Sequence, residues 1–171
     1  MKKLVLMVLL GLELVVMGCA TSTTPATPTT SANGNWEATL TGGAGPASQL
    51  DFITAFTVKD TNGGSSQPLS ISGFSFINSG SCFSSTAVTV SGSAALTTSN
   101  NNQVTGTISL TVTGGSSSLI LDGTTLTGTA NSGALSGGAV TGTWSLTGGS
   151  GCSGSGNFTM CQNATTCSTT T

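Results

Sequence analysis

Residues 88–96 and 104–113 alternate between apolar and hydroxyl-bearing side chains with a period of two. In residues 88–96, Val, Val, Gly, Ala and Leu occupy one set of alternate positions, and Thr, Ser, Ser and Ala occupy the other. Val, Gly, Ile, Leu and Val alternate with Thr and Ser in the same way across residues 104–113. Because successive side chains of a strand point to opposite faces, this pattern predicts β-strands with one apolar face. A disordered chain has no reason to hold this period, so we expect a folded domain.

Six further segments have the composition of strands and are separated by stretches rich in Gly, Ser and Asn: 35–41, 49–59, 69–78, 119–130, 139–147 and 156–161. The segment 119–130 contains Asp122-Gly123, a hairpin signal, so it is either two short strands or one strand with a bulge. No segment after residue 19 keeps an apolar period near 3.6, and β-branched residues dominate, which disfavours helix.

These strands predict an all-β, antiparallel fold. Short connections favour a meander, and about eight strands can close, or nearly close, into an up-and-down barrel that removes exposed edges. A β-sandwich is the alternative. The motif of an aliphatic residue, Ser or Thr, then Gly occurs six times, but at irregular intervals of 5 to 22 residues, which counts against a solenoid.

Alternation places the glycine of this motif on the inner face, where a missing side chain leaves room for a strand to coil or a bulky neighbour to pack. Trp144 lies two residues beyond Gly142 on the same face, so core filling is favoured over ligand contact. The phrases DGTTLTGT (122–129) and VTGTWSL (140–146) resemble strands of avidin-like and lipocalin-like barrels. That resemblance implies a barrel with a cavity.

The N-terminus has the pattern of a secretory signal peptide. Two lysines precede an apolar stretch, Leu4–Val16, that is too short to cross a bilayer of about 30 Å as a helix. Val16-Met17-Gly18-Cys19 resembles the lipobox of bacterial lipoproteins, and the chain resembles small Ser/Thr/Gly-rich lipoproteins of the bacterial envelope. The resemblance implies that Cys19 is the acceptor of palmitate-type acyl chains and anchors the protein in a membrane. Ala20, at the sorting position, implies the outer membrane.

Residues 20–34 carry no large apolar side chain and two prolines, so they cannot repay the entropy of ordering. Partly extended, they could span about 45 Å. The expected organisation is a signal peptide at 1–18, a lipidated cysteine and Thr/Pro-rich tether at 19–34, and a barrel domain at 35–171.

Five cysteines become four when Cys19 is lipidated, an even number for an exported, oxidised domain. Of the three possible pairings we favour Cys82 with Cys152, which closes a long loop, and Cys161 with Cys167, which are close in sequence. A metal site is not expected, because there is no CxxC spacing and no histidine.

The charge pattern excludes most other chemistry. The chain has three lysines, no arginine and no histidine, so it cannot neutralise a nucleic-acid backbone. Without histidine, and with Glu37, Asp51, Asp60 and Asp122 as its acids after residue 19, it is not expected to be an enzyme. No cofactor motif is present.

We therefore expect a membrane-anchored, non-catalytic binding module of the cell envelope. Its ligand would be a small apolar molecule in the interior, or a glycan on the surface held by Trp36 or an exposed Phe, and Trp36 and Trp144 are the candidate contacts. The alternative is a structural or adhesive surface protein without a small-molecule ligand, served by the hydroxyl-rich outer face.

Overall fold

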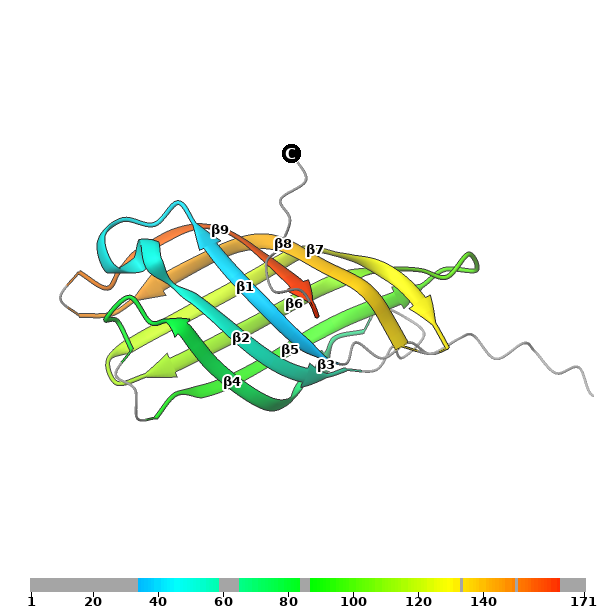
Figure 1. Ribbon diagram of the computed structural model, residues 1–171, viewed down its shortest axis with the longest axis horizontal. Helices are drawn as coiled ribbons and strands as arrows, with labels where there is room; N and C mark the ends of the chain where they lie inside the picture. Colours follow the sequence, from blue (N-terminus) through cyan, green and yellow to red (C-terminus); the bar gives the residue numbers. More distant parts are fainter. Residues whose placement is uncertain (1–33, 59–64, 84–86, 133, 150, 164–171) are drawn as a thin grey trace, which may run out of the picture.

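One curled antiparallel sheet makes up most of the fold (Figure 1). The structure, a computed structural model, describes residues 34–58, 65–83, 87–132, 134–149 and 151–163. Within them the strands are β1 (Asn35–Thr41), β2 (Asp51–Thr57), β3 (Gln67–Pro68), β4 (Ser70–Asn78), β5 (Thr89–Thr98), β6 (Gln103–Gly114), β7 (Ser117–Asn131), β8 (Ala134–Thr147) and β9 (Gly154–Gln162). A short 3-10 helix, Gly45–Gln49, connects β1 to β2.

The order of the strands brings the two ends of the sheet together. It runs β3-β5-β6-β7-β8-β9-β1-β2-β4, so β5 to β9 form a meander and β1 pairs with β9. The first and last strands of this order, β3 and β4, are consecutive in the chain and separated only by Leu69. The sheet is therefore a strongly curled half-barrel that approaches closure without completing it.

The predicted all-β antiparallel meander is confirmed, and the sandwich alternative is wrong because the strands form one sheet. The eight predicted segments correspond to β1, β2 and β4 to β9. The two-residue β3 was not predicted, because Gln67–Pro68 is too short to show a period. The segment 119–130 is one strand with a register shift between Gly123 and Thr125, not a hairpin.

Inward-facing side chains fill the curl of the sheet. The largest fully buried ones are Trp36, Trp144, Phe52, Phe56, Phe158, Leu50, Leu110, Leu119, Leu121, Leu126, Leu146 and Met160. They come from β1, β2, the segment before β2, and β6 to β9, as the period of two requires. Burial of this apolar surface is the main favourable term in folding.

The glycine of the repeated motif lets neighbouring backbones approach. Gly142 of β8 pairs with Gly123 of β7, and a Cβ added at Gly142 would overlap the carbonyl oxygen of Asp122 and lie 2.6 Å from Gly123 Cα. At Gly128, another glycine of the motif, a Cβ would lie 2.5 Å from Leu135 Cδ1. Both reasons expected from the sequence therefore apply: strand coiling and a bulky neighbour.

Several sequence predictions lie outside the described residues. They concern the signal peptide at 1–18, the lipobox with Cys19, the tether as far as residue 33, Lys59, Asp60 and Cys167. None of the helical turns that the structure describes is long and apolar enough to cross a membrane.

Candidate functional site

The sheet fails to close at a seam between β4 and β5. At one end, β3 pairs with β5 through Gln67 opposite Ala94, and the Leu69 N–H donates to the Gly92 carbonyl at 2.9 Å. From Ser70 onward the chain pairs with β2 instead. The other edge of β4 therefore has no neighbouring strand among the described residues.

A bulge accompanies this divergence. Ala55 of β2 pairs with Gly73, but the next residue, Phe56, pairs with Ile71, so Ser72 is an extra residue in β4. A bulged strand bends and twists more strongly than a regular one. The bend of β4 is therefore consistent with its departure from β5 beyond Leu69.

The seam contains a groove of about 310 Å³, lined by Phe74, Ser75, Phe76, Ile77, Ser79, Phe83 and Val88. The lining includes both alternating positions of β4, so the groove surrounds the unpaired edge of that strand. None of the seven residues is charged. Ligand pockets usually start at about 300 Å³ and combine apolar walls with a few polar groups, and this groove meets both conditions.

Aromatic rings form one wall of the groove. Phe74 and Phe76 meet edge to face with centroids 5.0 Å apart, and Phe83 stacks on Phe76 at 4.7 Å. Phe52 of β2 supports both β4 rings from the core, at 5.0 and 6.2 Å. Such ring pairs contribute about 0.5–1.5 kcal/mol each beyond their buried area, so they give the groove a well-ordered wall.

Exposed apolar side chains lie beside this groove. Ile77, which lines it, is 54% exposed, and Ile53, opposite Ser75 in the β2–β4 register, is 40% exposed. The third large hydrophobic side chain exposed in the described residues is Ile120 of β7, which does not line the groove. Exposed apolar surface that gathers around a concave site is typical of a binding site.

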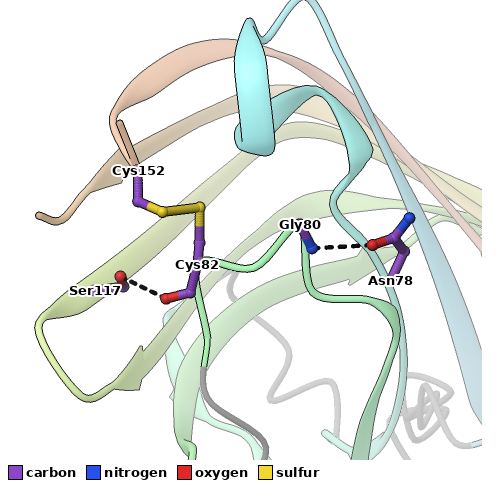
Figure 2. The surroundings of a disulfide bond; sticks show 5 residues. All are labelled: Asn78, Gly80, Cys82, Ser117 and Cys152. Atoms are coloured by element: carbon purple, nitrogen blue, oxygen red, sulfur yellow. Dashed lines mark hydrogen bonds between the residues drawn. A yellow bond between two sulfur atoms is a disulfide. The ribbon is translucent and has the colours of Figure 1, made fainter. Parts of the chain in front are cut away.

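A disulfide joins Cys82, the residue before Phe83, to Cys152 in the β8–β9 connection (Figure 2). This is the pair that the sequence favours, and the Cα atoms are 5.4 Å apart. Ser117 Oγ donates to the Cys82 carbonyl at 2.7 Å, and the Gly80 N–H donates to Asn78 Oδ1 at 3.0 Å. Cys161 lies on β9, and its predicted partner Cys167 is outside the described residues.

The two tryptophans belong to the core. Trp36 is 0% exposed and stacks on Phe56 at 5.2 Å, and its Nε1 has no hydrogen-bond partner in the described structure. Trp144 is 2% exposed, and its Nε1 donates to the Thr41 carbonyl at 2.9 Å. Burial thus corrects the surface-glycan contact expected for Trp36, because its ring has no exposed face, and Trp144 has the core-filling role that the sequence favours.

The described carboxylates do not all lie together. Glu37 and Asp51 lie on neighbouring strands β1 and β2, whereas Asp122 lies on β7 and accepts from Ser109 Oγ at 3.2 Å. Burial, and then the negative charge of Glu37, raise the pKa of Asp51, while a hydrogen bond from the Phe52 backbone lowers it. Among the described residues, no three His, Cys, Asp or Glu side chains gather as metal ligands would.

Asp51 should make stability fall as pH rises. Because its folded pKa is raised, the folded state holds the proton more tightly, so stability is highest below the ordinary value of about 3.9 and falls as pH rises through the folded pKa. The group is only partly buried, so solvent screens it and we expect Asp51→Asn to stabilise the protein at pH 7 by only a few tenths of a kcal/mol. Urea unfolding at pH 3 and pH 7 tests this. If the free energy of unfolding falls as much between pH 3 and pH 7 in Asp51→Asn as in the wild type, the prediction is contradicted.

Polar side chains, most of them hydroxyls, form a cross-strand row on the outer face. The row crosses six strands from β5 to β1: Ser93, Ser109, Asp122, Thr143, Asn157 and Thr41. Shallow hollows of about 240 and 360 Å³ lie on either side of Asp122. The row itself is polar, with one carboxylate at Asp122.

Sequence reasoning missed the groove residues Phe74, Phe76 and Phe83. Phe74 and Phe76 are two residues apart in FSF, which signals one aromatic face, but nothing in the sequence shows that β4 lacks a second neighbour. No family model, curated protein or solved structure matches the chain.

Proposed function

We propose that this protein is a non-catalytic binding module of the bacterial cell envelope that holds a small, uncharged, apolar ligand in the groove between β4 and β5. The observation that supports this most directly is the groove itself, an uncharged hollow of about 310 Å³ with an aromatic wall. Buried side chains fill the interior of the curl, so the ligand site is the seam.

The chemistry of the lining defines the ligand class. Three phenylalanines, an isoleucine and a valine provide apolar contacts, and the hydroxyls of Ser75 and Ser79 provide polar ones. A charged ligand would lose its hydration without finding an opposite charge in this lining, which is costly. The preferred ligand is therefore a neutral molecule with an aromatic or aliphatic body and at most one or two polar groups.

The envelope location rests on the N-terminal sequence. In this proposal Cys19 carries the lipid anchor, and the disulfide between Cys82 and Cys152 is suited to an oxidising compartment such as the periplasmic side of the outer membrane. Asn35, where β1 begins, pairs with Ala55 at the end of the sheet opposite the loop that carries Phe83. The groove would then open away from the anchored end.

A matched pair of isoleucine variants tests the proposal. Phenylnaphthylamine, an uncharged fluorescent aromatic amine, should bind the purified protein, and its fluorescence should increase on binding. Ile77→Ser replaces an exposed apolar side chain of the groove lining with a short polar one, so we expect the dissociation constant to rise roughly five- to tenfold. Ile120→Ser removes a similarly exposed isoleucine from β7 and should leave the affinity unchanged. Equal affinities of the two variants would contradict the proposal.

The hydroxyl row around Asp122 favours a second function, weak adhesion to polar surfaces such as glycans. Flat arrays of hydroxyls suit wet, low-affinity contacts. This function predicts that Asp122→Ala weakens retention on immobilised polysaccharide while phenylnaphthylamine binding is unaffected, so the two candidates can be separated in one set of variants.

A further inference from the structure

Phe83 forms one wall of the groove. It lies in the connection after β4, not in a strand. Its ring is 4% exposed and stacks on Phe76. On its other side it covers the end of β6, where a Cβ added at Gly114 would lie 3.2 Å from Phe83 Cδ1 and 2.8 Å from Val88 Cγ1. The shape of the groove therefore depends on where this connection places Phe83.

The turn that leads into Phe83 is strained. It runs from Ser79 to Cys82 and is closed by the Cys82 N–H, which donates to the Ser79 carbonyl at 3.0 Å. Both central residues have positive φ, 56° at Gly80 and 62° at Ser81. Glycine accepts this conformation freely, whereas a residue with a Cβ such as Ser81 is disfavoured there by roughly 1–2 kcal/mol.

Two attachments act directly on Cys82, the residue before Phe83. The disulfide ties it to Cys152, and Ser117 Oγ, at the start of β7, donates to its carbonyl in a buried hydrogen bond (Figure 2). The β8–β9 connection and the β6–β7 turn thus hold one point of the chain. Cys82, Cys152 and Ser117 do not line the groove themselves.

We infer that the Cys82–Cys152 disulfide and Ser117 are positioning elements of the ligand groove: they hold the strained turn in place, keep Phe83 against Phe76, and make affinity for an apolar ligand depend on the oxidised state. This inference rests on the proposed function of the groove. Without the covalent attachment the turn can relax from the left-handed conformation at Ser81, and Phe83 no longer provides a fixed wall.

Because the position of Phe83 depends on the disulfide, the groove should also be sensitive to thiol reductants. A dithiol that reduces the bond transfers two electrons and two protons, so the S–S bond breaks, Cys82 and Cys152 become thiols, and the dithiol becomes a cyclic disulfide. Reduction would thus lower ligand affinity without any change in the residues that line the groove.

The test compares phenylnaphthylamine affinity and amide hydrogen exchange in the oxidised wild type and in Cys82→Ala/Cys152→Ala. We expect affinity to fall about tenfold or more, and exchange to accelerate at residues 79–83 more than in the strands. Adding Ser81→Gly to the double variant relieves the strain of the turn and should restore part of the lost affinity. A merely structural disulfide would not predict this rescue.

Ser117→Ala is an independent test of the inference, because this variant keeps the disulfide. It should weaken binding about threefold and accelerate exchange at residues 79–83, whereas Ser118→Ala, the neighbouring variant, should change neither. If the double cysteine variant does not fold, this pair decides the inference.

The outcomes separate the inference from the proposed function. If the wild type does not bind the probe, the proposed function of the groove fails, and exchange at residues 79–83 alone decides whether these groups position Phe83. If affinity and local exchange are the same in the wild type, the double cysteine variant and Ser117→Ala, the inference is overturned.

Discussion

Replacing Cys82 and Cys152 with alanine is expected to lower the free energy of unfolding by roughly 4 kcal/mol. The two cysteines are 70 residues apart in sequence, so the bond closes a loop that includes β5 to β8. In the chain-entropy account, cross-linking a loop of this length removes much of the freedom of the unfolded chain, and the variant regains it. Urea unfolding followed by tryptophan fluorescence measures the difference, because both tryptophans are buried in the folded state.

Reduction of the wild type provides the control for this effect. A dithiol reductant should lower the unfolding midpoint of the wild type at least as far as that of the double variant, because the predicted Cys161–Cys167 bond would be reduced as well. The slope of the transition should be smaller in the oxidised protein than in the reduced one, because the oxidised unfolded state is more compact. A loss below about 1 kcal/mol in the double variant would show that the bond does not restrict the unfolded chain as its loop length implies.

Gly142→Ala is expected to destabilise the protein by about 3 kcal/mol, the upper part of the range for overpacking. The added Cβ would overlap the carbonyl oxygen of Asp122 and the Cα of Gly123. These are backbone atoms of a paired strand, so they cannot rotate away as the end of a side chain can. The β7–β8 pairing must therefore open locally, which the same urea unfolding measures.

Gly73→Ala is the matched control for this substitution. An added Cβ at Gly73 of β4 would meet Ala55 Cβ at 3.7 Å, an ordinary contact. The change should stay within about 0.5 kcal/mol or stabilise slightly, because alanine reduces the freedom of the unfolded chain. Equal losses in the two variants would mean that close backbone approach is not the reason for glycine at position 142.

The strands were predictable because each carries its own evidence. The alternation in residues 88–96 and 104–113 is local. β5 contains the first segment except Val88, and β6 contains the second, with the expected faces inward. The glycine at position 142 was predicted on the same basis, since side-chain direction follows from the period of two. The same period of two predicted that the hydroxyl-bearing residues lie on the other face.

The groove was not predictable because it depends on what is missing beside a strand. Phe74 and Phe76 alternate like core residues, and only the divergence of β4 from β5 leaves them partly exposed. Phe83 lies in a connection with no period, and its place is determined by the distant partners Cys152 and Ser117. Trp36 was a candidate contact because aromatic rings often bind ligands, but burial against Phe56 gives it a core role.

The position of a bound probe tests the central claim, that the seam between β4 and β5 is a ligand site. The measurement is a methyl and aromatic NMR titration with phenylnaphthylamine, together with intermolecular NOEs. The account predicts NOEs from the probe to Phe74, Phe76, Ile77 and Val88, with the Ile120 methyls unaffected. NOEs to Ile120, or shifts spread over the outer face with none at the seam, would contradict it.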